Sequence, residues 1–160
     1  MSILKKNFGR RQDAIITDCF VVMPDGVTDG DGRSACRLLP KGRKNRRYCK
    51  IENAAWDTGA TNTVITPEIV TALGLKPSDK NAVSTLNGII NVDTYLIDLC
   101  FENGYKIANL RVFSSEDYSD FDYDVLIGMD VITKGDFVVS TVNGETTFSF
   151  RMPAKGLTID

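Results

Sequence analysis

Apolar side chains along this chain recur mainly at every second position, the spacing that places them on one face of a β-strand. The clearest example is the segment 82–101, in which two apolar, β-branched runs flank Asn87-Gly88. This dipeptide is the strongest local signal for a tight hairpin turn. The second run has an apolar residue at alternate positions, namely Tyr95, Ile97, Leu99 and Phe101. The pattern therefore predicts a β-hairpin with one buried face.

Further runs rich in β-branched and aromatic residues are bounded by turn formers, and each predicts a strand. Asn-Gly turns occur again at 103–104 and 143–144. The segment 124–142 is expected to hold a strand, a short helical turn ending near Gly135, and another strand. The remaining expected strands cover 14–23, 54–56, 105–113 and 145–152. Many short strands with tight turns are thus predicted along the whole chain.

One segment, 66–77, has clear helix boundaries. Thr66 can cap this helix, Pro67 suits its first position, and Gly74 suits its end. With one or two short helices among many strands, the sequence predicts a mainly β fold, closed or barrel-like.

Composition narrows the classes of function. With 160 residues, 42% of them hydrophobic, the chain has the size and apolar content of one globular domain. A net charge of −2 argues against a general nucleic-acid binder, which usually carries a basic balance. The chain has no histidine, which excludes Ser-His-Asp, Cys-His and His-metal chemistry within it. Acid-base chemistry must therefore come from carboxylates, or from Lys, Tyr or Cys.

The cysteines and the N-terminal segment indicate a compartment. The four cysteines have no C-x-x-C spacing, so the case for zinc is weak and no metal is expected. Asp13 and Asp18 interrupt the apolar start, so it does not read as a secretory signal. No apolar run is long enough to span a bilayer, and no membrane partner is expected. These features favour a cytoplasmic protein with reduced thiols at Cys19, Cys36, Cys49 and Cys100.

Two loop segments have a binding interpretation beside a plain one. The turn-rich segment 24–32 could imitate a calcium loop through its aspartates, but it lacks the EF-hand spacing, and we favour an ordinary loop. The basic run 41–47 could contact phosphate or an acidic partner, whereas its plain interpretation is a solvated loop. Nucleic-acid binding there would weaken steeply with salt. The residues concerned are Asp25, Asp29 and Asp31, and then Arg43, Lys44, Arg46 and Arg47.

The stretch 54–66, "AAWDTGATNTVIT", places Asp57 on a turn between two apolar segments. A turn that contains Gly59 allows backbone N–H groups to point at the carboxylate of Asp57. The same tripeptide also occurs as an ordinary turn between strands. Its surroundings favour the first interpretation, because "DVLIGMD" follows about sixty residues later.

From roughly Cys49 to Met152 the sequence resembles the retropepsin-like aspartic proteases, which are single-lobe relatives of pepsin that include retroviral proteases and small bacterial members. The motifs that carry the resemblance are Asp-Thr-Gly-Ala, the helix, the hairpin and "VLIGMD". The resemblance implies a closed β-barrel with a flap hairpin, a peptide or protein substrate under that flap, and no cofactor. It also implies that Asp57 is the catalytic acid. The same resemblance assigns Thr58, Gly59 and Ala60 to its loop, Leu86, Asn87, Gly88 and Ile89 to the flap over the substrate, and Leu126, Ile127 and Gly128 to the segment that braces the loop.

The chemistry of this family needs two carboxylates, and the chain has only one Asp-Thr-Gly. A two-fold homodimer would supply the second Asp57. Met129 stands where retroviral members have Arg, and the N-terminal portion is longer than theirs. The alternative is a catalytically idle module of the same fold that dimerises or binds peptides.

The expected domain organisation is simple. We expect a single domain over 14–152 with a basic loop insertion near 24–48. A flexible arm at 1–13 precedes this domain, and a tail at 153–160 follows it. The sequence leaves open whether the N-terminal portion is a propeptide, a dimer arm or part of the sheet.

Overall fold

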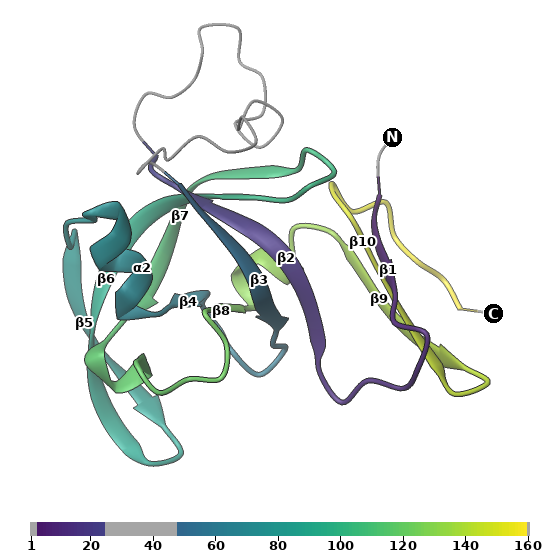
Figure 1. Cartoon of the computed structure of the whole chain (residues 1–160), viewed down its shortest axis with the longest axis horizontal. Coiled ribbons are helices and arrows are strands. Elements are labelled where there is room, and N and C mark those ends of the chain that lie inside the picture. The colour runs from purple at the N-terminus through teal and green to yellow at the C-terminus, as the bar shows by residue number, and fades with distance from the viewer. Residues whose placement is uncertain (1–2, 25–47, 160) are drawn as a thin grey trace, which may run out of the picture.

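The structure is a computed structural model of the whole chain, and it describes residues 3–24 and 48–159 (Figure 1). The candidate calcium loop, the basic run and Cys36 fall in 25–47, outside the described residues. The basic loop insertion expected near 24–48 lies almost entirely there as well.

Seven strands form the larger sheet, in the order β2-β3-β8-β4-β7-β6-β5. Strand β2 also pairs with β6, so the hydrogen-bonded strands close on themselves and β5 is left at the outer edge. The strands are β2 (Ile15–Val22), β3 (Tyr48–Trp56), β4 (Val64–Ile65), β5 (Asp79–Thr85), β6 (Gly88–Cys100), β7 (Lys106–Ser114) and β8 (Val125–Ile127).

A second sheet of three strands, β1-β10-β9, lies on the side of the molecule away from β5 (Figure 1). Its strands are β1 (Leu4–Asn7), β9 (Asp136–Val142) and β10 (Glu145–Arg151). The expected flexible arm at 1–13 is therefore wrong for Leu4–Asn7, which pairs antiparallel with β10. The polar sequence "LKKN" hid this strand, because a strand with three exposed residues has no apolar alternation to detect.

Three short helical segments complete the fold: α2 (Pro67–Leu73), the 3-10 helix η1 (Glu116–Tyr118) and α3 (Met129–Ile132). As predicted, α2 begins with Pro67 and ends at Gly74, which adopts φ 62° and ψ 36°. The prediction that Thr66 caps this helix is wrong, because its side chain makes no capping hydrogen bond. The Thr66 hydroxyl is buried without a partner among the described residues.

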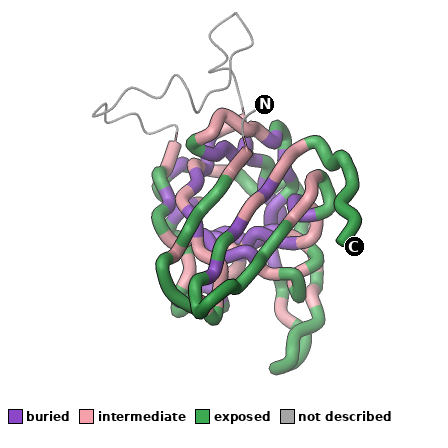
Figure 2. The backbone as a smooth tube through the Cα atoms, turned by 90° about the vertical axis from the view of Figure 1, so that its right-hand side faces the viewer, coloured by how far each residue is buried: buried purple, intermediate pink, exposed green. Residues whose placement is uncertain are grey.

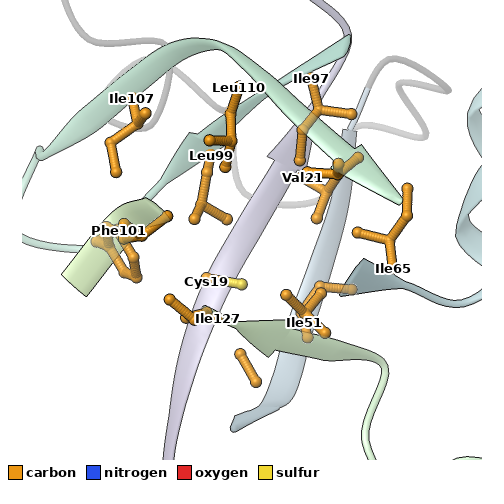
Figure 3. Packing of buried hydrophobic residues seen from close by; sticks show 14 of the residues in the cluster. Cys19, Val21, Ile51, Ile65, Ile97, Leu99, Phe101, Ile107, Leu110 and Ile127 are labelled. Carbon is orange, nitrogen blue, oxygen red and sulfur yellow. The ribbon is translucent and has the colours of Figure 1, made fainter. Parts of the chain in front are cut away.

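One apolar core lies between the strands of the larger sheet (Figure 3). Its members also include residues of β10, so the core reaches the second sheet. The alternating residues of β6 point inward as predicted, and Ile97, Leu99 and, directly after the strand, Phe101 have no exposed surface. Trp56, at the end of β3, joins the sheets. Its ring stacks on Phe101 at 5.6 Å and contacts two aromatic rings of β10, Phe148 and Phe150, at 5.0 Å each. The end of β3 is thereby fixed in place, which matters because Asp57 follows it.

The cysteines only partly match the expectation of reduced thiols. Cys19 and Cys49 are free, whereas Cys100 is disulfide-bonded, so the expectation is wrong for Cys100. Spacing along the sequence does not reveal which side chains the fold brings within bonding distance. Among the described residues, no helix is long and apolar enough to cross a membrane.

Candidate active site

Asp57 is the first residue after β3, and its position is fixed by backbone hydrogen bonds. Its N–H donates to the carbonyl oxygen of Ile127 in β8 at 2.8 Å, and its carbonyl oxygen accepts the N–H of Ala60 at 3.2 Å. The N–H of Gly59 donates to the Asp57 Oδ1 at 2.8 Å. Asp57 is half-buried and Thr58 is exposed. The turn therefore orients the carboxylate with a backbone donor, as the sequence suggested.

Strand β8 supports this loop because it lies in the sheet between β3, which precedes the loop, and β4, which follows the loop. Residues 54–56 of β3 pair parallel with β8, and Val64-Ile65 of β4 pairs antiparallel with it. The loop that carries Asp57 thus crosses the end of β8. The structure brings Leu126, Ile127 and Gly128 together with the loop, in the arrangement expected of a bracing segment.

Gly128 is required where β8 meets the loop. A Cβ at this position would lie 2.7 Å from the carbonyl carbon of Asn62 and 2.8 Å from the carbonyl oxygen of Ala60. The same Ala60 oxygen accepts the N–H of Met129 at 2.8 Å. Any side chain at 128 would push the loop that carries Asp57 away from β8, and this close approach explains the glycine.

Asp130 is a site residue whose role the sequence did not reveal. Its Oδ2 accepts the N–H of Thr63 at 2.9 Å, and its Oδ1 accepts the Thr63 hydroxyl at 2.8 Å and the N–H of Val131 at 2.9 Å. The Thr63 hydroxyl oxygen in turn accepts the N–H of Gly128 at 3.2 Å. The backbone N–H of Asp130 donates to Thr61 at 3.2 Å. One carboxylate therefore links the end of the Asp57 loop to the start of α3.

The predicted flap is the hairpin of β5 and β6, which pairs from Asp79↔Thr94 to Thr85↔Gly88. Its two-residue turn is Leu86-Asn87, and Gly88 carries the positive φ of 116°. Leu86 is 107% exposed and Ile89 is 76% exposed. The structure thus gathers the expected flap residues at one hairpin tip, open to solvent.

An apolar cluster connects the strands that flank the Asp57 loop to the hairpin. Val64 and Leu126 come from the strands around the loop, and Val83 and Ile90 come from the facing strands of the hairpin. From the sequence, Ile89 and Ile90 could each line a substrate pocket or belong to the core. In the structure the two residues have different environments. Ile90 packs in this cluster, whereas Ile89 points to solvent. The other members are Val92, Phe113 and Tyr118.

A cavity of about 680 Å³ lies between α2, the base of the hairpin and 114–116. Its lining includes Lys80, Asn81 and Ala82 of β5. Val92 of β6 both lines the cavity and belongs to the apolar cluster, so the two adjoin at the base of the hairpin. No residue from Asp57 to Asn62 lines this cavity, and we do not assign the candidate active site to it.

The free thiols are poor nucleophiles. Burial raises the pKa of Cys19 far above its ordinary value, and the nearby carboxylates of Asp18 and Asp124 raise it further. Burial and Asp124 also raise the pKa of Cys49. The thiolate is the nucleophilic form of a cysteine, so neither thiol is a candidate nucleophile.

Residues 51–134 match a family model described as gag-polyprotein putative aspartyl protease. The match covers more than half of the chain and includes the Asp57 loop, the hairpin and residues 126–128. No curated protein shows a significant match to the chain.

Two solved structures are similar to this chain. A retropepsin-like aspartic protease from Rickettsia conorii aligns over 94% of both chains, with 15% identity and a TM-score of 0.52. The protease of Simian Foamy Virus (mac) aligns over 51% of this chain and 78% of its own, with 23% identity and a TM-score of 0.37. The Rickettsia likeness confirms the predicted mainly β, retropepsin-like fold.

Proposed function

This chain belongs to the gag-polyprotein putative aspartyl protease family, and from that premise we propose that it is an aspartic endopeptidase that works as a homodimer. Each subunit contributes one Asp57, and the two carboxylates together form the catalytic pair. The observation that carries the proposal is the loop itself, in which β8 and a backbone donor hold a half-buried carboxylate in a fixed position.

The pair works by sharing one proton. Two carboxylates about 3 Å apart do not both ionise, so one is protonated and the other is not. The ionised carboxylate takes a proton from water as the water oxygen attacks the peptide carbonyl carbon. The protonated carboxyl donates its proton to the carbonyl oxygen. The resulting gem-diol collapses when the amide nitrogen is protonated and the C–N bond breaks, which gives a new carboxyl and a new amine.

The substrate is an extended peptide held between the catalytic loop and the flap. Leu86, Asn87, Gly88 and Ile89 would close over it, with Ala60 at the loop beneath. Strand-like hydrogen bonds would hold its backbone. The apolar cluster around Leu126 and Ile90 supports apolar side chains next to the scissile bond.

Replacement of Asp57 tests the proposal. Asp57→Asn keeps the shape of the side chain but cannot accept the proton from water, so cleavage of a denatured protein or a peptide library at mildly acidic pH should fall by on the order of a thousandfold. The measurement is product formation by mass spectrometry, with circular dichroism to show that the variant is folded.

Equal cleavage by the wild type and Asp57→Asn would contradict the proposal. Binding of peptides by both proteins without cleavage by either would favour the alternative, an idle module that binds peptides. The cytoplasmic location stays a prediction from the sequence.

A further inference from the structure

The cavity at the base of the hairpin has no role in the function proposed above. It has a volume of about 680 Å³ and lies between α2, β5, β6 and residues 114–116. A second hollow of about 410 Å³ adjoins it, since Pro67, Thr71 and Glu116 line both. In Figure 1 these elements lie on the side of the molecule away from the three-stranded sheet, and Figure 2 views the molecule from that sheet. A volume of several hundred Å³ is typical of ligand pockets.

Carboxylates outnumber cations on the walls of the cavity and the adjoining hollow. Asp93 and Glu116 line the cavity, and Glu68 lines the hollow. The only lysine or arginine among the described residues of these walls is Lys80. Within the same described part of the chain, no ion pair involves any of the three carboxylates. The walls therefore carry an excess of negative charge that is available to a cationic ligand.

Three neighbouring strands place polar side chains of the cavity in one row. Asp93 of β6 is the cross-strand partner of Lys80 on β5 and of Ser114 on β7. Residues directly opposite each other in antiparallel strands share one face of the sheet, and all three line the cavity. Ser114 is only 3% exposed, and its hydroxyl has no hydrogen-bond partner among the described residues. A buried hydroxyl without a partner costs free energy, and an N–H donor from a ligand would remove that cost.

Tyr95 lies two residues after Asp93, on the same face of β6, and also lines the cavity. Burial raises the pKa of its phenol, and the charge of Asp93, a hydrogen bond with that carboxylate and the charge of Glu116 raise it further. Both carboxylates therefore lie near one phenol group, close enough to attract the same bound cation.

An apolar part of the cavity favours a long basic side chain. Val70 of α2 and Val92 of β6 line the cavity together with the polar row. Lysine and arginine bury their methylene stems against apolar surface while the charged head stays among polar groups. Val92 also belongs to the apolar cluster that supports substrate side chains, so the cavity adjoins the proposed path of the peptide.

We propose that this cavity binds the side chain of a lysine or arginine of the peptide substrate, outside the catalytic cleft. The inference rests on the proposed function, because the ligand belongs to the peptide that the catalytic pair would cleave. The charged head lies between Asp93 and Glu116, and the stem packs against Val70 and Val92. The Ser114 hydroxyl accepts one N–H of the ligand. The substrates are then peptides with a basic residue at a fixed distance from an apolar cleavage site.

Binding of a charged probe tests the cavity without cleavage. The probe is Nα-acetyl-arginine amide, and Nα-acetyl-citrulline amide is its neutral counterpart of nearly the same shape. Amide NMR spectra of the wild type should shift at 91–95 and 114–116 with the arginine probe, and the citrulline probe should bind at least fivefold more weakly. Glu116→Gln should weaken binding of the arginine probe by about three- to tenfold. The matched control is Glu102→Gln, because Glu102 is also exposed but lines neither hollow.

Cleavage of a peptide library at mildly acidic pH tests whether the bound residue belongs to the substrate. The wild type should favour Lys or Arg over Gln about five- to tenfold at one position several residues from the cut, through KM and not kcat. Glu116→Gln should lose most of this preference and cut the same bonds. Glu116→Lys should shift the preference to Asp or Glu at that position, because two ammonium groups then face Asp93. A misfolded variant would not reverse the preferred charge.

The outcomes separate this inference from the proposed function. An arginine probe that does not bind the wild type, or that binds Glu116→Gln equally well, overturns the cation site and leaves the peptidase standing. Binding at the cavity together with cleavage that ignores basic residues overturns the assignment to the substrate and indicates a free organic cation. Binding that Glu116→Gln weakens, in a protein that cleaves no peptide, supports the cation site and overturns the peptidase and the substrate assignment with it.

Discussion

Asp130 shows how much of the position of the Asp57 loop depends on a single side chain outside it. Its carboxylate accepts three hydrogen bonds, two of them from Thr63, and Thr63 has no exposed surface. The Thr63 hydroxyl oxygen in turn accepts the N–H of Gly128. Buried polar groups in such a network are costly to leave without a hydrogen bond, so a change at Asp130 should alter the position of Asp57, six residues before Thr63.

We predict that Asp130→Asn lowers both stability and catalysis. An amide has one acceptor oxygen and one NH₂ group, so at least one of the three donors around it would face another donor. The free energy of unfolding should fall by about 1–3 kcal/mol. Because the substrate contacts are elsewhere, kcat should fall more than KM rises. Urea unfolding and steady-state kinetics on one peptide give both values.

Thr63 offers the matched pair of controls for this prediction. Thr63→Ser keeps the hydroxyl and should behave nearly as the wild type, whereas Thr63→Val removes it and should resemble Asp130→Asn. If Asp130→Asn changes neither the unfolding midpoint nor kcat, the carboxylate does not hold the loop.

At the residue scale, the sequence pointed to Asp57 as the candidate acid but not to the side chains that hold its loop. Asp57 was singled out because Asp-Thr-Gly, the hairpin and "LIGMD" occur in one order. Asp130 lies inside the last of these motifs, but nothing in a linear pattern says that its partner is Thr63, which is 67 residues away. The only local signal was the position of Asp130, an acidic residue in the first turn of the short helix α3. Acidic residues are common at helix starts, so this position does not by itself indicate a hydrogen bond to a distant loop.

Among the elements, the C-terminal tail is held by a carboxylate clamp. Asp136 Oδ2 accepts the N–H of Lys155 at 2.9 Å and two Arg151 N–H groups at 2.9 and 2.6 Å. Its Oδ1 accepts the N–H of Gly156 at 3.2 Å. These donors, the Lys155 N–H first and then the Arg151 guanidinium, hold the pKa of Asp136 below its ordinary value. The clamp fixes the tail, whose Leu157 helps to line a groove with Val138 of β9.

The pKa of Asp136 gives the sign of the pH effect. Because the pKa of Asp136 is lowered in the folded state, the clamp makes its full contribution to the stability of the fold at pH values above the ordinary pKa of aspartate. This contribution is lost as the pH falls through the lowered pKa. The tail should therefore stay clamped at the mildly acidic pH expected for catalysis.

We predict that Asp136→Asn releases the tail. The amide keeps an acceptor oxygen but loses the charge that draws Arg151 and both backbone N–H groups. Trypsin at neutral pH should then cut after Lys155 several-fold faster, as mass spectrometry of the loss of 156–160 would show. Cleavage after Arg11, which is exposed, followed by Gln12 and far from the clamp in sequence, serves as the internal control. Equal rates after Lys155 in both proteins would mean that the clamp does not hold the tail.

Most elements could be predicted from local pattern, and the exceptions have physical reasons. The strands β2, β6, β7 and β10 and the helix α2 follow from alternation, turn residues and the Pro and Gly at the helix ends. Strand β1 was missed because its stability comes from pairing with β10 and not from its own sequence. The 3-10 helix η1 was missed because the acidic segment 114–124 has neither an apolar period nor a helix-ending glycine.

At the scale of the whole molecule, the mainly β class was predictable but the strand order was not. Strand β8 inserts between β3 and β4, and β2 closes onto β6. These pairings join segments far apart in the sequence, and the alternation of apolar residues within a strand does not indicate which strands pair with it. Local pattern alone was compatible with several closed β folds, and the resemblance to retropepsins indicated which of them to expect.

The last prediction concerns the assembled molecule, whose activity should depend on subunit pairing. If each site needs two Asp57 residues, a wild-type subunit paired with Asp57→Asn is inactive. After subunits exchange, an equal amount of Asp57→Asn should lower the activity of a fixed amount of wild type to about half, and a tenfold excess to about a tenth, because random pairing removes wild-type homodimers. Activity measured immediately after mixing, before exchange, is the control. An activity that stays constant at every ratio would show that one chain carries a complete site and would refute the half-site argument for Asp57.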